Sequence, residues 1–194
     1  ESQNKFGELL EAKACGFMIP KMVYTNDSRS AQKFLFDSPA VLKESGLKFF
    51  KNTNGDFLFF RNKKINPLDK KISFISNTPC MFQEFIDKDY DVRATVVGNK
   101  ILACKITAQA DGMAKIDWRG NEHLAKFTPY KIPNQIESKI LRFANKKGFN
   151  LATFDFVVDQ KGKYYFLEMN RPGQWFFAEA LSGIPIAQTL SKML

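Results

Sequence analysis

The chain has 194 residues, and 29 Lys and Arg against 20 Asp and Glu give it a formal net charge of +9. Hydrophobic residues at 44% and aromatic residues at 14%, among them 20 Phe, exclude a disordered or low-complexity chain. No apolar run approaches the ~20 residues of a membrane span and no apolar leader is present, so we expect a cytoplasmic protein without a membrane partner. The excess of positive charge favours an anionic partner such as a nucleic acid, a nucleotide or an acidic peptide.

The three cysteines, Cys15, Cys80 and Cys104, form no CxxC pair, and His123 is the only histidine. This excludes a structural zinc site of the usual Cys/His spacing. An odd number of cysteines in a chain of this size indicates reduced thiols and an intracellular setting. Because each cysteine stands among apolar neighbours, we expect all three to be buried as small hydrophobic side chains.

The first part of the chain predicts a compact α+β lobe. Apolar residues recur at helical spacing from Phe6 onward, and Asp27 or Ser28 is a suitable N-cap for a second helix. Short apolar runs between polar loops are typical of strands. The predicted elements are a helix at Asn4–Cys15, a strand at Met22–Thr25, a helix at Arg29–Phe36, and strands at Pro39–Lys43 and Phe57–Phe60.

The second part of the chain is more regular. Gly98-Asn99 and Gln160–Lys163 provide hairpin turns, and Gly148 is expected to end a helix. The polar stretch Asn66–Thr78 is expected to separate two lobes, residues 1–78 and 79–194. The predicted strands are Cys80–Ile86, Val92–Val97, Ile101–Ile106, Leu151–Val158 and Lys163–Met169, and the predicted helices are Ile136–Ala144 and two short ones from about Trp175 and Ala187.

Three polar residues, Asp155, Glu168 and Asn170, stand inside apolar runs of the last predicted hairpin, where an unpaired carboxylate would be expensive. Glu168 and Asn170 are two residues apart on one strand and therefore share a face. A tight hairpin centred near Gly162 places Asp155 opposite Glu168. Two carboxylates and an amide oxygen on one face suit Mg²⁺ that keeps water and phosphate ligands. The alternative is a pair of carboxylates neutralised by Lys or Arg on a solvated sheet face.

Other polar segments carry weaker signals. Residues 82–93 run from an apolar strand through a charged turn into another strand, which offers backbone groups to an adenine edge and an acid to a ribose; alone, this is a polar loop between strands. In Asp117–Arg119 the central tryptophan would hold the guanidinium rigid for a phosphate, and the alternative is a surface ion pair. Lys5 and Lys43 adjoin structured elements and, taken alone, are ordinary surface lysines.

The order of these segments along the chain is itself informative, and Asp155 followed after thirteen residues by Glu168-x-Asn170 is a specific signature. In this order they resemble the ATP-grasp carboxylate–amine ligases, and within them the peptide maturases of the microviridin or graspetide type. The resemblance spans almost the whole chain. It rests on Asn4–Lys5, Gly16–Pro20, Val41–Lys43, Phe82–Ile86, Asp91–Arg93, Asp117–Arg119, Asp155 and Glu168–Trp175.

The resemblance implies an α+β ATP-grasp fold, in which two lobes with mainly antiparallel sheets clasp ATP between them. It also implies that ATP is bound together with one or two Mg²⁺ ions. The implied roles are contact with the ATP phosphates for Lys5 and Lys43; lining of the adenine pocket for Gln83, Glu84, Phe85 and Ile86, with the backbone of Phe85 and Ile86 reading the adenine edge; contact with the ribose for Lys88 or Asp91; metal ligation for Asp155, Glu168 and Asn170; and catalytic stabilisation of the transferred phosphoryl group for Arg119, Arg93 and Lys43.

The implied reaction converts a carboxylate and ATP into an acyl-phosphate, which a hydroxyl or an amine then attacks. Metal ions and cationic side chains would overcome the repulsion between the carboxylate and the γ-phosphate. In the graspetide type the acid is an Asp or Glu side chain of a ribosomally made precursor peptide, and the nucleophile is a Thr or Ser hydroxyl or a Lys amine of the same peptide. We therefore expect an acidic precursor peptide as the partner and ω-ester or ω-amide crosslinks as products.

The sequence allows two alternative functions, and it differs from the family's pattern in two respects. A ligase of the same fold would instead add a free amino acid to a protein or a small molecule. A basic module that binds RNA fits less well, because Lys and Arg are scattered and no RNA-recognition motif is evident, so no nucleic-acid partner is expected.

The sequence after Lys43 has little of a glycine-rich phosphate loop. The N-terminal domain of roughly a hundred residues that these ligases carry is absent before the Lys5 helix, so we expect two lobes of a larger, homodimeric enzyme.

Overall fold

The computed structural model describes residues 5–43, 49–51, 53–55, 57–59, 63–108, 125–171 and 174–193. The chain divides into two compact units. The first unit comprises Glu1–Phe6 and Pro20–Ile86, and the second comprises Gly7–Ile19 and Asp87–Leu194.

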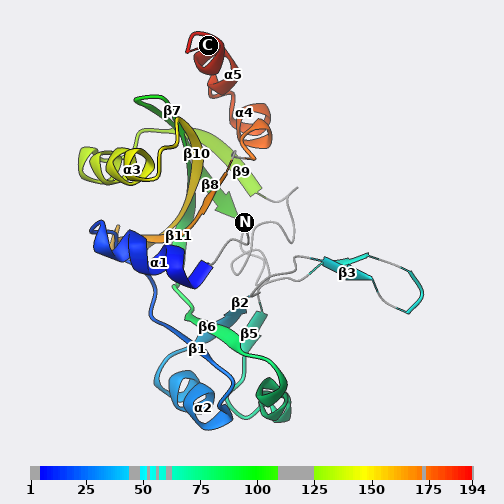
Figure 1. The fold of residues 1–194 in the computed structure, drawn as a ribbon. Helices are drawn as coiled ribbons and strands as arrows, with labels where there is room; N and C mark the ends of the chain where they lie inside the picture. Colours follow the sequence, from blue (N-terminus) through cyan, green and yellow to red (C-terminus); the bar gives the residue numbers. More distant parts are fainter. Residues whose placement is uncertain are drawn as a thin grey trace. The chain divides into compact units, whose positions relative to one another are not determined.

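The first unit contains a four-stranded antiparallel sheet in the order β1-β6-β2-β5, with a helix and a 3₁₀ helix beside it (Figure 1). A separate two-stranded ribbon is formed by β3 and β4. The elements are β1 (Met22–Thr25), α2 (Ser28–Asp37), β2 (Ala40–Lys43), β3 (Phe49–Lys51), β4 (Phe57–Phe59), β5 (Lys63–Ile65), the 3₁₀ helix η1 (Lys70–Asn77) and β6 (Cys80–Glu84).

The core of the first unit lies between the sheet and its two helices. The Asp27 side chain caps α2 by accepting hydrogen bonds from the backbone N–H groups of Arg29 and Ser30, which satisfies donors that the helix itself leaves unpaired. The stretch expected as a polar seam folds instead as η1, and its two isoleucines, three residues apart, share one buried face. The buried cluster consists of Ala31, Leu35, Ala40, Ile72, Ile75 and Phe82.

The second unit is built on a five-stranded antiparallel sheet in the order β11-β10-β7-β8-β9. A glycine turn at Gly98, whose φ is +59°, joins β7 to β8, as the sequence predicted. The elements are α1 (Lys5–Ala14, of which residues 7–14 belong here), β7 (Lys88–Val97), β8 (Lys100–Ala108), β9 (Ala125–Tyr130), α3 (Asn134–Lys146), β10 (Leu151–Asp159), β11 (Tyr164–Asn170), α4 (Phe176–Ser182) and α5 (Ile186–Ser191).

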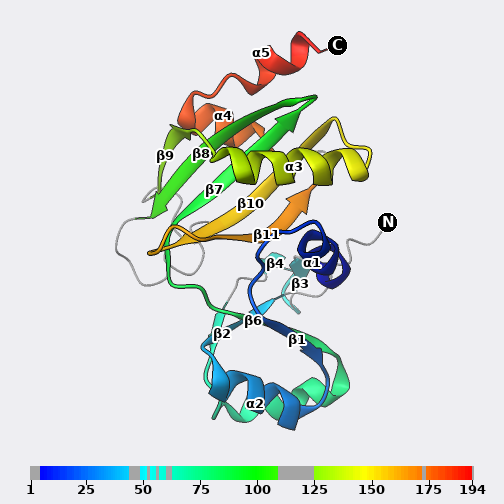
Figure 2. The same ribbon diagram turned by 90° about the vertical axis from the view of Figure 1, so that its left-hand side faces the viewer.

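Helices cover the two faces of this sheet (Figure 2). On the face covered by α3, phenylalanines meet at ring-centroid distances of about 6 Å, with Phe143 of α3 6.1 Å from Phe154 and 6.0 Å from Phe166. The opposite face is covered by α4 and α5, where Cys104 and Ile106 of β8 pack with Ala178 and Ile186. The alternation of side chains along each strand therefore separates two cores.

The structure contains the elements that the sequence predicted, and it adds β3, β5, η1 and β9. β9 contains Pro129, which a strand tolerates here because β9 lies at the edge of the sheet, where the missing N–H is not needed. The expected boundary between residues 78 and 79 differs from the observed one after Ile86, because β6 pairs with β1 and β2 and so belongs to the first unit. Residues 7–19 belong to the second unit, where the backbone of Met18 pairs with β11.

Candidate functional site

A β-bulge in β11 determines which residues face Asp155. Near the turn the hairpin is regular, and Phe156 pairs with Phe166. The register then shifts by one residue, so that Leu167 has no partner and Asp155 pairs with Glu168, as the sequence predicted. Without this bulge Leu167 would lie opposite Asp155, and Glu168 and Asn170 would point to the other face.

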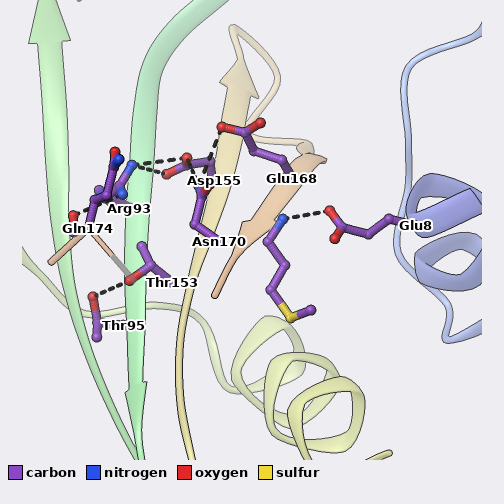
Figure 3. A network of polar contacts seen from close by, with 9 residues as sticks. Glu8, Arg93, Thr95, Thr153, Asp155, Glu168, Asn170 and Gln174 are labelled. Carbon is purple, nitrogen blue, oxygen red and sulfur yellow. Dashed lines mark hydrogen bonds and ion pairs between the residues drawn. The ribbon is translucent and has the colours of Figure 1, made fainter. Parts of the chain in front are cut away.

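Asp155 is held by a buried arginine on the neighbouring strand. Arg93 of β7 pairs with Asp155 in the sheet register and is only 2% exposed. Its Nη1 lies 3.0 Å from both Asp155 carboxylate oxygens, and its Nη2 donates to the Gln174 carbonyl at 2.9 Å (Figure 3). The guanidinium also lies 4.5 Å from the centre of the Phe177 ring in α4. Both Nη atoms of Arg93 therefore contact protein groups, whereas its buried Nε has no hydrogen-bond partner among the described residues.

Asn170 connects the two carboxylates. Its Nδ2 lies 3.2 Å from Asp155 Oδ2 and 3.4 Å from Glu168 Oε1, so one amide NH₂ group donates to both carboxylates (Figure 3). A cation near these carboxylates would meet the same two oxygens, and a half-turn of the amide would present Oδ1 to it in place of Nδ2. The described residues contain no group of three or more His, Cys, Asp or Glu that fits a metal ion. Two carboxylates and one amide oxygen would leave room for the phosphates and waters with which Mg²⁺ is usually bound.

Glu8 of α1 is a member of this network that the sequence did not reveal. Its Oε1 accepts the backbone N–H of Met169 at 2.7 Å, between the two predicted ligands on β11. Burial raises the pKa of the Glu8 carboxyl, and the nearby Glu168 charge adds to this increase. The contact joins residues 161 positions apart, and no local pattern marks Glu8 among the charged residues of its helix.

The predicted adenine-pocket residues lie together at the end of β6 in the first unit. Gln83 is 2% exposed in the middle of the sheet, and the backbone N–H of Glu84 donates to the Lys21 carbonyl. The N–H of Phe85 donates to the Pro39 carbonyl at 2.7 Å, so this N–H is already used within the protein. Phe85 and Ile86 follow β6, which ends at Glu84, and are not part of the strand.

The two predicted ribose contacts are paired with each other. Lys88 Nζ lies 2.9 Å from Asp91 Oδ1 and 2.6 Å from Oδ2, and both side chains are mostly buried. Residues three apart on a regular strand face opposite sides, but Asp89 has no partner on β10 and forms a second bulge. The bulge brings Lys88 and Asp91 to one side of the strand.

The remaining predicted residues lie at the ends of elements or outside the described part of the chain. Lys5 is the first residue of α1, and Lys43 is the last residue of β2. Both belong to the first unit, and each takes part in further interactions. Arg119, with Asp117 and Trp118, lies outside the described residues.

The cysteines are free thiols, and their burial differs. Cys15 and Cys104 are buried as expected, whereas Cys80 is only half-buried. Burial raises the pKa of Cys104 to about 11, so this thiol is protonated and unreactive at neutral pH. None of the helices in the described ranges combines the length and the apolar character that crossing a membrane requires.

Comparison with known proteins places this geometry in context. Residues 10–194 match the model of the RimK-like ATP-grasp domain, which confirms the ATP-grasp fold expected from the sequence. Comparison with curated protein sequences gives no match.

Two solved structures are similar over nearly the whole chain. A RiPP-associated ATP-grasp ligase from Chryseobacterium gregarium, in complex with ADP and a leader and core peptide, is 27% identical with a TM-score of 0.90 over 98% of this chain and 58% of its own. The macrocyclase MdnC from Microcystis aeruginosa MRC, bound with the precursor peptide MdnA, is 26% identical with a TM-score of 0.85 over 100% of this chain and 61% of its own. The chain thus spans about three fifths of the length of these proteins.

The ATP-grasp ligase PsnB, complexed with a phosphomimetic variant of a minimal precursor, Mg and ADP, has the same fold. It is 19% identical with a TM-score of 0.75 over 98% of this chain and 58% of its own.

Proposed function

We propose that this chain, which belongs to the RimK-like ATP-grasp domain family, is the ATP-binding part of a ligase that activates side-chain carboxylates of a precursor peptide. The γ-phosphoryl group of ATP would pass to an Asp or Glu carboxylate of the peptide, leaving ADP. A Thr or Ser hydroxyl or a Lys amine of the same peptide would attack the acyl carbon, and the C–O bond to phosphate would break. The products are an ω-ester or ω-amide crosslink and inorganic phosphate.

The observation that carries this proposal is the meeting of Asp155, Glu168 and Asn170 around one point on the face of paired strands. Their oxygens are the hard ligands that Mg²⁺ prefers, and their small number leaves room for phosphate oxygens. When bound there, Mg²⁺ supplies positive charge that neutralises the phosphates during phosphoryl transfer. The fit supports the predicted set of metal ligands.

The chain's own residues would prepare this site before the nucleotide arrives. Arg93 holds both oxygens of Asp155, which fixes the carboxylate and offsets its charge. We propose that Arg93 acts through Asp155, and that contact with the transferred phosphoryl group falls to Arg119 and Lys43. Lys5 and Lys43 would bind the phosphates as point charges.

Adenine recognition follows from the hydrogen-bond directions at the end of β6. Because the N–H of Phe85 is used by Pro39, we assign the donor to the adenine edge to Ile86. Gln83, Glu84 and Phe85 would line the pocket, and the buried Lys88–Asp91 pair would lie near the ribose.

Support for a peptide substrate comes from the two solved structures that are 26–27% identical, both of which contain bound peptides. The net charge of +9 is consistent with an acidic peptide and a triphosphate as partners. We expect the full-length enzyme to be a homodimer, which sedimentation of the longer protein would test.

The experiment that tests the proposal combines nucleotide binding with product mass. Titration calorimetry is expected to detect ATP binding that depends on Mg²⁺ and is lost in Asp155→Asn and Glu168→Gln. The full-length enzyme, incubated with ATP, Mg²⁺ and a precursor peptide encoded beside its gene, should lower the peptide mass by about 18 Da, one water per crosslink. Unchanged ATP hydrolysis in both variants would contradict the assigned ligands.

A ligase that adds a free amino acid is the second candidate, because the RimK-like domain model matches the chain. The two candidates differ in one assay. A mixture of free amino acids would stimulate ATP turnover and raise the product mass only for the second candidate, whereas a peptide that loses water without such a mixture supports the first.

A further inference from the structure

The outer edge of β11 carries two hydrogen bonds that depend on the bulge. The N–H of Phe166 donates to the Met18 carbonyl at 2.9 Å, and the N–H of Met169 donates to Glu8 Oε1 at 2.7 Å. In a regular strand, outward N–H groups recur at every second residue. Here they are three residues apart, because the unpaired Leu167 lies between them. The two acceptors therefore match the bulged form of the strand.

The Glu8 carboxylate binds a backbone N–H. The next glutamate of the same helix, one turn later, binds a cationic side chain instead. Glu11 forms an ion pair with Lys147 at the end of α3. Glu8 instead lies half-buried against β11, with the Glu168 charge nearby and its own pKa raised mainly by burial. Keeping a carboxylate in such a place is costly, and the hydrogen bond to Met169 offsets that cost together with the nearby charges of Arg171 and Lys147.

We propose that Glu8 is a positioning residue for the metal ligands: by accepting the Met169 N–H, it holds the β11 bulge that turns Glu168 and Asn170 toward Asp155. The metal-binding part of this inference rests on the proposed function, whereas the strand-holding part does not. Groups that orient metal ligands from outside the coordination shell typically change metal affinity by about 10–100-fold when removed. The hydrogen bond needs an acceptor oxygen at this reach, and it does not need a charge.

Three substitutions at Glu8 separate these requirements. Glu8→Gln keeps an acceptor oxygen at the same distance, Glu8→Asp keeps the charge but shortens the reach by one methylene, and Glu8→Ala removes both. Glu11→Ala is the matched control, because it lies on the same helix and has its ion pair with Lys147 rather than with β11. Thermal unfolding of each variant shows whether it folds, and the Asp and Gln variants still decide the question if the Ala variant does not.

The first measurement is hydrogen exchange of the Met169 amide, followed by NMR without any ligand. We expect fast exchange in Glu8→Ala and Glu8→Asp, and protection close to wild type in Glu8→Gln and Glu11→Ala. The second is binding of Mn²⁺ with ADP, followed by electron paramagnetic resonance, with Mn²⁺ in place of Mg²⁺. We expect affinity about tenfold lower or more in Glu8→Ala, a smaller loss in Glu8→Asp, and less than threefold change in Glu8→Gln and Glu11→Ala.

Several results would overturn the proposal. Wild-type Mn²⁺ affinity in Glu8→Ala would show that the ligands do not depend on Glu8, even if the Met169 amide exchanges faster. A loss in Glu8→Gln equal to that in Glu8→Ala would show that the charge matters and not the hydrogen bond. If the wild-type chain does not bind Mn²⁺ with ADP, the proposed function and the metal part fall together, and exchange at Met169 alone decides whether Glu8 holds the strand.

Discussion

Replacing Arg93 by methionine is expected to expose the energetic role of its bond to Asp155. Methionine fills much of the same volume without the charge, so packing against the Phe177 ring is largely kept. The change removes two contacts to the Asp155 carboxylate and one to the Gln174 carbonyl, and leaves Asp155 mostly buried without this partner. Removing one member of a buried ion pair typically costs about 3–5 kcal/mol, and we expect a loss of unfolding free energy in this range.

A double-mutant cycle with Asp155→Asn isolates the pair. With the charge at position 155 removed, Arg93→Met should cost only about 1–2 kcal/mol, for the hydrogen bond to Gln174 and the cation–π attraction to Phe177. The coupling energy should therefore be about 2–3 kcal/mol. Urea unfolding followed by circular dichroism, without nucleotide or metal, measures all four variants. A coupling below about 0.5 kcal/mol would refute the view that Arg93 holds Asp155.

Further predictions concern the core, Tyr90 of β7 and the Asp27 cap of α2. Phe143→Ala removes a fully buried ring and should cost about 3–5 kcal/mol in urea unfolding, whereas Phe36→Ser, at a site 64% exposed, should stay within about 0.5 kcal/mol. Burial raises the pKa of Tyr90 to about 12, so the stability that its neutral form provides is present below pH 10 and lost toward pH 12. Absorbance at 295 nm should show a late-ionising phenol that Tyr90→Phe removes; an unchanged titration would contradict this. Hydrogen bonds from Ser30 hold the pKa of Asp27 below its usual range, so Asp27→Ala should lower Tm above pH 4, with a difference that shrinks as the pH falls further. An equal difference at pH 2 and pH 7 would contradict the capping role.

Much of the candidate site could be predicted because its signals are local in sequence. Hairpin arithmetic placed Asp155 opposite Glu168, and the observed pairing confirms it. The register near the turn differs from the predicted one by one residue. The bulge at Leu167 shifts it back, so that Asp155 pairs with Glu168 as predicted. Phe166 and Met169 are both buried although they are three residues apart, a spacing that a regular strand does not place on one face. This odd spacing is the pattern by which the sequence reveals the bulge.

The parts that the sequence did not predict depend on contacts between distant segments. Glu8 meets Met169 only because α1 packs beside an edge strand. The position of Arg93 on a strand is local information, but its burial depends on α4 and the residues just before it, which bring Phe177 and Gln174 to it. Likewise, η1 looked polar because its isoleucines are few, and only their contact with α2 makes them a core.

The covered edge of β11 limits how a peptide can approach the sheet of the second unit. An extended peptide often binds by adding a strand to a free sheet edge, where its backbone pairs with unused N–H and C=O groups. At β11 the N–H groups of Phe166 and Met169 are already taken by Met18 and Glu8. A peptide that extended the sheet there would have to displace a backbone carbonyl and a carboxylate, and would loosen the strand that carries Glu168. Recognition of an extended peptide by strand addition is thus disfavoured at the edge nearest the proposed metal ligands.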